Sequence, residues 1–370
     1  MQNKDYKQLH VYAYMRSNRI FEHASDIDAI VLLNGTEPHV DMSFFYVTGL
    51  TSGLFEGCAA IIYPDSVEIM ASTLEEESAR KGEMEVTVFA DKKERDVLLK
   101  EKLAPLDTIG INADEMTYSS YLSLQNVTDA RLIDVSQAIK KARLIKDTSE
   151  IERTRKACSI ISQVADEIPD LVTESMTELE LAAELVYSMQ KKGASGPAFS
   201  TLVCFGKNAS EPHHSSGTTP LQHGDFILVD MGALFERYVS DITRTYIFGN
   251  ADEKQIDMYE TVLESQRIGL KAMKDNIQGK DVHIKVKNFL DQKYKDRFIH
   301  GLGHSIGLSV HDGERMSEDS PLVLKEGMIF TVEPGLYIPG YGGVRIEDDV
   351  LITTEGVEIL THANKELQII

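Results

Sequence analysis

Three of the 11 histidines of this chain lie within the stretch FIHGLGHSIGLSVHD, which begins at Phe298. His300 and His304 are four residues apart, a spacing that on a helix would place both side chains on one face. The glycines at 301, 303 and 307 disfavour a helix, and glycine in an apolar, strand-like run is typical of close backbone approach or a bulge. We therefore expect extended chain or a loop that brings imidazoles, including that of His311, into a tight site. The alternative is a surface turn with incidental histidines.

An acid interrupts the apolar stretch FILVDMGALF at Asp230. A carboxylate in a buried strand is costly unless it is paired or bound to a metal. If the chain folds back with its midpoint between Phe235 and Glu236, Asp241 lies directly opposite Asp230, with Cβ atoms roughly 4.5–5.5 Å apart. Two carboxylates that close repel each other unless they share a proton or a divalent cation.

A second pair of acids follows the same design in TVEPGLYIPGYGGVRIEDDV. Glu333 ends one apolar strand, Glu347 lies in another, and the proline and glycines between them predict a turn. A midpoint at Gly340 places the two glutamates opposite each other, although Pro334 must disturb the ladder. For each acid alone, an exposed charge on an edge strand is the alternative.

Four carboxylates and one imidazole form a ligand set made mostly of oxygen. Such a set favours Mn, Co or Fe(II) over the thiolate coordination of structural zinc, and four negative charges balance two dications. Two metals about 3.5–4 Å apart can hold a bridging water, lower its pKa and polarise a carbonyl. The residues alone therefore predict a two-metal hydrolase.

Composition limits what kind of protein could carry this chemistry. The 370 residues are enough for two domains, and 59 acidic against 38 basic residues give a net charge of −21, which argues against nucleic acid or an anionic membrane as partner. The start, MQNKDYKQLHVYAY, lacks the apolar core of a signal peptide, and no apolar run approaches a membrane span. Three widely spaced cysteines without a CxxC pair predict buried reduced thiols, so we expect a cytoplasmic protein.

The elements that must position the acids begin after a predicted boundary near residue 140, in the polar and basic segment VSQAIKKARLIKD. Up to about residue 135, helical patterns alternate with short buried strands. We therefore predict domains of residues 1–140 and 141–370.

Helix signals are clear in the second part of the chain. Asp147 with Glu150 predicts a capped helix start, and Pro169 predicts the end of that helix. Thr177 and Glu180 predict a capping box for a second helix that ends before the glycine at 193. A third helix is predicted over 253–276.

Four motifs taken together, VDMGALFERYVSDITRT, FIHGLGHSIGLSVHD, TVEPGLYIP and GGVRIEDDV, resemble those of the metallopeptidase family that contains methionine aminopeptidase, aminopeptidase P and prolidase. The resemblance implies an α+β protein. Its pita-bread catalytic domain would follow a smaller α/β N-terminal domain of the creatinase/prolidase type.

The resemblance also implies a role for individual residues. The implied metal ligands are Asp230, Asp241, His304, Glu333 and Glu347. Glu347 resembles a bridging carboxylate together with Asp241, and Glu333 resembles the general base for a bridging water.

The resemblance also implies roles for four side chains around the ligands. His213 matches a histidine that lines the substrate pocket of the family, with the choice between it and the neighbouring His214 left open. His311 matches a histidine near the scissile bond, His300 is expected to support the ligands, and Arg345 resembles a residue that contacts substrate or orders the site.

The activity implied by this resemblance is hydrolysis of the peptide bond that precedes proline. We expect an Xaa-Pro dipeptidase (prolidase), with aminopeptidase P acting on longer peptides as the alternative and a non-catalytic pita-bread binding protein as the alternative of another class. Because all five ligand positions are filled, the enzyme is favoured. The expected cofactors are two divalent ions per chain, Mn or Co first, with Fe and Zn as further candidates. The expected partners are small peptides with proline in second position and, as a homodimer, a second copy of the chain. A dipeptidase needs a cation for the proline carboxylate, for which Arg345 and Arg315 are the candidates.

Overall fold

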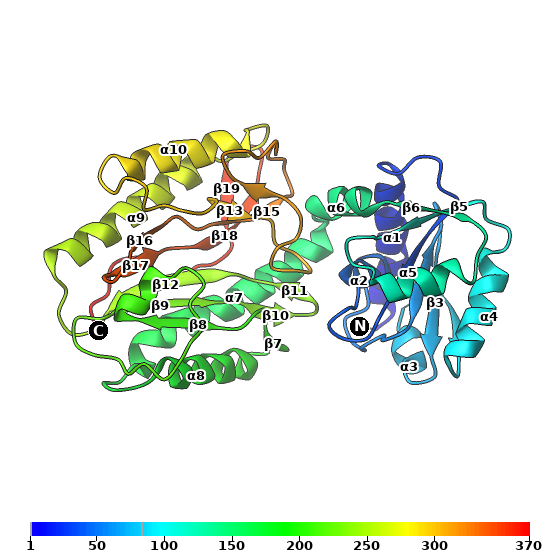
Figure 1. Cartoon of the computed structure of the whole chain (residues 1–370), viewed down its shortest axis with the longest axis horizontal. Helices are drawn as coiled ribbons and strands as arrows, with labels where there is room; N and C mark the ends of the chain where they lie inside the picture. The colour runs from blue at the N-terminus through cyan, green and yellow to red at the C-terminus, as the bar shows by residue number, and fades with distance from the viewer. Residues whose placement is uncertain (1, 83) are drawn as a thin grey trace. The chain divides into compact units, whose positions relative to one another are not determined.

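The computed structural model describes residues 2–82 and 84–370 (Figure 1). The chain divides into two compact units, of which the first runs to Arg143 and the second spans Leu144–Ile370. The polar segment in which the sequence placed a linker forms helix α6 (Ser136–Leu144). None of the helices in the described part of the chain combines the length and the apolar character that crossing a bilayer requires.

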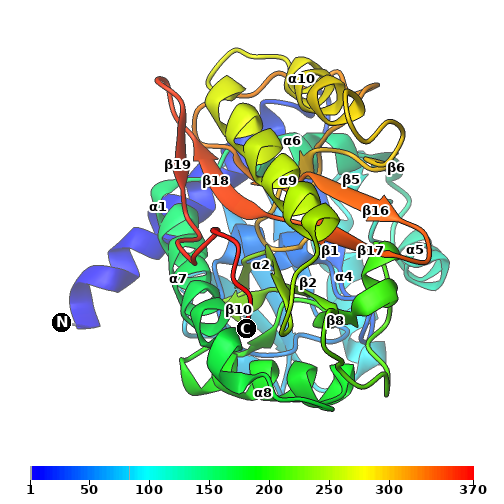
Figure 2. The same ribbon diagram turned by 90° about the vertical axis from the view of Figure 1, so that its left-hand side faces the viewer.

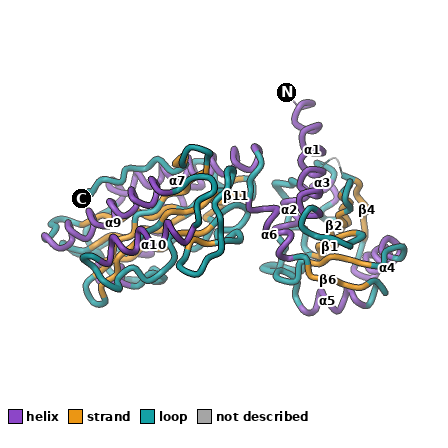
Figure 3. Tube along the Cα trace, turned by 90° about the horizontal axis from the view of Figure 1, so that it is seen from above, coloured by secondary structure: helices purple, strands orange, loops and turns teal. Residues whose placement is uncertain are grey.

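The first unit is built around a six-stranded mixed sheet with helices beside it (Figure 3). In chain order its elements are α1 (Gln2–Phe21), β1 (Ala29–Leu33), α2 (Met42–Thr48), β2 (Ala59–Ile62), β3 (Val67–Ser72), α3 (Glu76–Ala79), β4 (Glu85–Phe89), α4 (Lys92–Leu103), β5 (Thr108–Ile111), α5 (Tyr118–Gln125), β6 (Arg131–Asp134) and α6. The strand order is β4-β3-β2-β1-β5-β6. The alternation of helix and short buried strand expected for this part of the chain is present.

The second unit places strands between two pairs of helices, the layered arrangement of a pita-bread fold. Its helices are α7 (Thr148–Leu171), α8 (Glu178–Lys191), the short 3-10 helix η1 (Gly206–Ser210), α9 (Glu253–Ala272) and α10 (Gly279–Asp291). Its strands are β7 (Gly196–Pro197), β8 (Leu202–Phe205), β9 (Phe226–Met231), β10 (Ala233–Phe235), β11 (Tyr238–Val239), β12 (Ile242–Ile247), β13 (Gly303–His304), β14 (Arg315–Met316), β15 (Ile329–Val332), β16 (Gly335–Ile338), β17 (Gly342–Arg345), β18 (Asp348–Ile352) and β19 (Val357–Ile359). The pair α7 and α8 lies on one side of these strands and the pair α9 and α10 on the other (Figure 1), and Figure 2 shows α9 crossing in front of β16, β17 and β18.

Both helices of the first pair begin as the sequence predicts. Asp147 with Glu150 and Thr177 with Glu180 each form a complete capping box. Two helix ends differ from expectation. Helix α7 continues past Pro169 to Leu171, because a proline in the last turn removes only one hydrogen bond near a frayed end, and α9 ends at Ala272 rather than at 276.

Strand β9 explains how an acid comes to lie inside this unit. Ile227, Val229 and Met231 pack in the core on the side of α7 and α8, whereas Phe226 and Leu228 pack in the core beneath α9 and α10. Because side chains alternate along a strand, Asp230 continues the row of Phe226 and Leu228. The three cysteines are free and buried, as expected.

Candidate metal centre

The first pair of acids is carried by the antiparallel strands β9 and β12, in a register that differs from the predicted one. Asp230 faces Thr243 rather than Asp241, so the expected register is wrong by two residues. The connection through β10 and β11 turns at Glu236 and Arg237, both of which have positive φ. This conformation is usually supplied by Asn-Gly, so Glu-Arg is no recognisable signal for a turn of this type. A shift of two residues preserves the face, which leaves Asp241 diagonal to Asp230.

The second pair of acids lies in the predicted register. Strands β16 and β17 pair Gly335 with Arg345, and the ladder of β15 and β18 keeps the same register on the other side of Pro334. Glu333 and Glu347 stand between the two ladders and are therefore opposite each other. Pro334 interrupts the hydrogen bonding without changing the alignment.

Hydrogen bonds from β12 join the two pairs of acids. The Glu347 N–H donates to the Thr243 carbonyl (3.1 Å), and the Thr243 hydroxyl donates to Glu347 Oε2 (2.6 Å). The Arg345 N–H donates to Thr245 Oγ1 (3.2 Å), and this hydroxyl donates to the Arg345 carbonyl (2.9 Å). Glu347 is thereby held against the strand that follows Asp241.

The glycine-punctuated histidine stretch is a loop with one two-residue strand, in line with the expected extended chain or loop, and this strand, β13, brings His304 beside the acids. The Glu333 N–H donates to the Leu302 carbonyl (2.9 Å), and the His304 N–H donates to Thr331 Oγ1 (3.1 Å). A Cβ atom at Gly303 would lie 2.0 Å from the Thr331 carbonyl oxygen. Only glycine allows this approach, because any side chain would push the two strands apart.

The side chains converge as a set that could hold a metal ion. His304 Nε2 lies 3.4 Å from Glu333 Oε1 and 3.7 Å from Asp241 Oδ2. One ligand atom each from Asp241, His304 and Glu347 lies within 4.8 Å of the other two. Among the described residues, Asp230 Oδ1 and Asp241 Oδ1 are buried side-chain oxygens without a hydrogen-bond partner. Since buried polar atoms are normally bonded, these oxygens fit a cation that completes the site.

Crowding of buried acids raises their pKa values. Burial raises the pKa of Glu333 to about 8, with the charge of Arg345 lowering it and that of Asp230 raising it. Burial, followed by repulsion from Glu347 and Asp230, raises the pKa of Asp241 well above its ordinary value. Burial and repulsion from Glu333 do the same for Glu347. Burial and repulsion therefore disfavour the ionised form of these carboxyls. Positive charge close to them would favour that form again.

The imidazole of His304 is suited to donate a lone pair. Burial, with a smaller effect from the neighbouring His311, lowers the pKa of His304 to about 4. The ring is therefore neutral at pH 7. The two rings lie edge to face with centroids 4.4 Å apart, so His311 stands directly beside the cluster.

Arg345 is bound on all three of its side-chain nitrogens. Nη2 lies 2.6 Å from Asp230 Oδ2, Nε donates to Thr243 Oγ1 (3.0 Å), and Nη1 donates to the Tyr337 hydroxyl (2.8 Å). Burial lowers the Arg345 pKa, but Tyr337, Asp230 and Glu347 outweigh this effect and raise it well above its ordinary value. Of the two predicted roles, substrate contact or order of the site, this geometry provides order.

The other predicted histidines, His300, His213 and His214, have different surroundings. His300 Nε2 lies 3.0 Å from the Tyr337 hydroxyl, which links it through Arg345 to the acids. His214 Nε2 lies 3.0 Å from Glu178 Oε2. His213 is exposed, and after burial and Arg345 its charge is among the causes that lower the pKa of His300 to about 4.

Sequence reasoning missed several residues that support the acids. Asp349 is fully buried, and its Oδ2 accepts hydrogen bonds from the Asp241 N–H (2.8 Å) and the Cys158 thiol (3.3 Å). Thr243 could have been found, because it follows Asp241 by two residues and shares its face. Tyr337 and Asp349 act across the fold, which no local pattern indicates.

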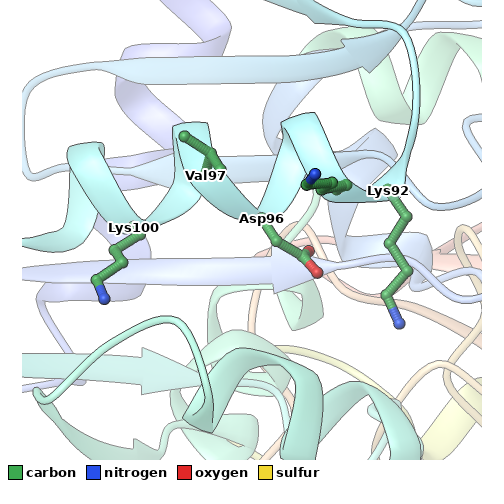
Figure 4. Close-up of a pocket in the computed structure, with 5 residues that line it drawn as sticks. Lys92, Asp96, Val97 and Lys100 are labelled. Carbon is green, nitrogen blue, oxygen red and sulfur yellow. The ribbon is translucent and has the colours of Figure 1, made fainter.

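A second feature, in the first unit, is a shallow hollow on α4 (Figure 4). It is lined by Lys92, Lys93, Asp96, Val97 and Lys100. None of the predicted site residues lies there, and flexible lysines around one acid on a helix surface offer no arrangement for chemistry.

Comparison with known proteins agrees with this fold. The model of metallopeptidase family M24 matches residues 152–354, and that of the Creatinase/Prolidase N-terminal domain matches residues 20–145. The chain belongs to metallopeptidase family M24. It has the pita-bread unit of that family behind a creatinase/prolidase-type N-terminal domain.

Similar proteins carry two kinds of name. A Xaa-Pro dipeptidase of Pyrococcus furiosus is 38% identical over 330 residues, which cover 88% of this chain and 92% of that protein. Among solved structures, a Xaa-Pro dipeptidase from Bacillus anthracis matches with a TM-score of 0.89 and 32% identity, over 98% of this chain and 100% of the other. An X-Pro aminopeptidase from Thermotoga maritima matches with a TM-score of 0.87 and 31% identity, over 93% and 98%.

Proposed function

We propose that this protein hydrolyses the peptide bond before proline in dipeptides, as a Xaa-Pro dipeptidase that uses two divalent metal ions. The observation that carries the proposal is the convergence of four acids and one neutral imidazole in a single cluster, in which Asp241 and Glu347 are buried and the other side chains are partly buried. The proposed ligands are Asp230, Asp241, His304, Glu333 and Glu347. The names of similar proteins support the substrate class.

The chemistry of the donor set fits hard or borderline dications, for which we propose Mn or Co. Two such ions, when bound, would supply positive charge to polarise a carbonyl and to lower the pKa of water. The unpartnered oxygens of Asp230 and Asp241 and the raised pKa values of Asp241 and Glu347 support this assignment. Metal analysis of the reconstituted protein should find two ions per chain. A chain that binds none under saturating conditions would instead be a pita-bread binding protein.

We assign the side chains around the cluster separate roles in hydrolysis. We assign Glu333 as the general base, because its carboxylate lies at the cluster, with Oε1 3.4 Å from His304 Nε2. We assign His311 as the donor to the substrate carbonyl, whose negative charge grows during attack. We assign His213 to the substrate pocket and His300 to the support of the ligands, and Arg345 keeps Asp230 in place.

The distinction between dipeptides and longer peptides depends on the proline carboxylate. Each side-chain nitrogen of Arg345 already has a partner within the site, so we assign the carboxylate to Arg315. Arg315 is exposed and stands opposite His304 in the ladder of β13 and β14. Over the described residues its guanidinium has neither an ion pair nor a hydrogen bond, which leaves it available for a charge-assisted bond to a free carboxylate.

The decisive experiment compares Ala-Pro, Ala-Pro-amide and Ala-Pro-Ala with the Mn-loaded protein. We expect kcat/KM to be highest for the free dipeptide, and Arg315→Met to reduce that advantage while leaving the amide nearly unaffected. Arg267→Gln, which removes an exposed arginine paired only with Glu264 and Glu366 on the surface, is the matched control. Faster cleavage of Ala-Pro-Ala would identify an aminopeptidase P.

Two further expectations stay predictions. The homodimer implied by the family resemblance can be tested by sedimentation of the purified chain. The cytoplasmic location expected from the polar start and the reduced cysteines can be tested by fractionation of cells.

A further inference from the structure

Glu178 is a fully buried acid outside the metal cluster. It is the first residue of α8, yet that helix is already capped by Thr177 and Glu180. The side chain of each accepts a hydrogen bond from the backbone N–H of the other. Capping therefore does not explain Glu178. A buried carboxylate is costly unless it is well bonded, so its partners indicate its purpose.

All side-chain partners of Glu178 belong to one segment, residues 205–217. Oε1 accepts hydrogen bonds from the Phe205 N–H and from Asn208 Nδ2, both at 2.8 Å. Oε2 accepts from the Gly217 N–H at 2.8 Å and lies 3.0 Å from His214 Nε2. Burial alone would raise the Glu178 pKa, but these bonds outweigh it and lower the pKa, so the side chain is an anion.

The four donors enclose the loop that carries His213. Phe205 ends β8, at the entry to the loop, and Gly217 lies at its exit. Two backbone bonds close the same end, since the Glu178 N–H donates to the Thr219 carbonyl (3.3 Å) and the Leu179 N–H to the Gly217 carbonyl (3.0 Å). One carboxylate thus ties both ends of the loop to α8.

This arrangement gives the two adjacent histidines different tasks. His214 points to Glu178 and is fixed by it, whereas its neighbour His213 is exposed and near enough to His300 for its charge to affect that ring. His300 in turn contacts Tyr337, which receives a bond from Arg345. Holding His214 therefore restrains the backbone from which the exposed His213 extends.

We infer that Glu178 is a positioning residue, whose anionic side chain clamps residues 205–217 so that His213, and not His214, is presented to the peptide substrate. This inference rests on the proposed peptidase function and deepens it. Among the described residues, the hydrogen-bond partners of the Glu178 side chain include none of the proposed metal ligands.

The test is a double-mutant cycle of Glu178→Gln with His213→Ala. Glutamine keeps the shape but replaces one acceptor oxygen with an amide that opposes the N–H donors. With Mn-loaded protein and Ala-Pro, we expect Glu178→Gln to lower kcat/KM about 10- to 100-fold, with unchanged metal content. In the His213→Ala background the same change should have little further effect, because Glu178 acts through His213. If the losses of kcat/KM in the two single variants multiply in the double variant, the inference is overturned. A His213→Ala variant with normal turnover would overturn it as well.

Two variants keep the result interpretable. Glu180→Gln perturbs the cap of the same helix and should lower stability without changing kcat/KM. If Glu178→Gln does not fold, Asn208→Ala removes one of the four donors and enters the same cycle, with the same expectation of non-additivity.

A measurement independent of activity separates this inference from the proposed function. Amide hydrogen exchange of residues 202–219 should be faster in Glu178→Gln than in Glu180→Gln. If no Xaa-Pro peptide is cleaved, the cycle is run on any peptide that is, and faster exchange still supports the clamp. Unchanged exchange in this segment overturns it, whatever the substrate.

Discussion

In the metal-free protein, the free energy of unfolding should fall as the pH rises from about 5 to 8. In the metal-free site, burial raises the pKa of Glu333 from 4.5 to about 8. Between those values the folded chain holds a proton that the unfolded chain has released. Stability therefore falls with increasing pH, by about 1.4 kcal/mol per pH unit for each such proton.

The magnitude follows from the same pKa. For Glu333 alone, the interval from 4.5 to about 8 corresponds to on the order of 5 kcal/mol, fully present at low pH and lost once the pH passes the folded-state pKa. Asp241 and Glu347, whose pKa values are also raised, act in the same direction. Bound dications replace these protons, so the loaded protein should show little slope, and the stabilisation by Mn should grow with pH.

The assay is urea unfolding followed by far-ultraviolet circular dichroism, because the chain has no tryptophan to report by fluorescence. Calorimetry on the same samples separates the two units if they unfold independently. For the metal-free protein, Glu333→Gln should reduce the slope of unfolding free energy against pH by the contribution of about one proton. The reason is that the amide does not titrate in this range. Metal-free protein whose stability is constant or increases between pH 5 and 8 would refute the reasoning.

Three further predictions follow from single side chains. Asp241→Asn should reduce turnover by orders of magnitude and weaken at least one metal site, as measured by kcat and by metal content after dialysis; near-normal values for both would remove Asp241 from the ligand set. Arg345→Met should release Asp230 and leave a buried carboxylate without its 2.6 Å partner, lowering stability by about 3–5 kcal/mol in the metal-free protein; an unchanged urea midpoint would contradict this. Glu236→Asn should raise stability by about 0.5–1 kcal/mol, because asparagine tolerates the positive φ of 46° at this turn better than glutamate; a lower midpoint would count against the turn as described.

The elements that could be predicted from the sequence are those with a local cause. The capping boxes at Thr177 and Asp147 depend on residues three apart, and both are present. The Glu333 hairpin could be aligned because a proline and glycines fix its turn at Gly340. The Asp230 hairpin could not, because its turn is made by residues that seldom adopt positive φ.

Contacts that close the site across the fold were beyond sequence reasoning. Arg345 could be placed near the acids from its motif, but its three bonds depend on Thr243 and Tyr337 arriving from other strands. Glu178 gave no sign beyond its place at a helix start, where acids are common. Its burial became visible only when the loop of His214 was seen folded onto it.

Charge balance connects the metal cluster with the choice of substrate. The sequence alone sets four carboxylates against two dications, which is neutral. The structure adds the buried guanidinium of Arg345 beside Asp230, so a site loaded with two dications carries one net positive charge. With the exposed Arg315 on the facing strand, we expect a site loaded in this way to favour a substrate that brings a carboxylate close to its scissile bond. A free Xaa-Pro dipeptide has its carboxylate one residue from that bond, and an amide or a longer peptide does not.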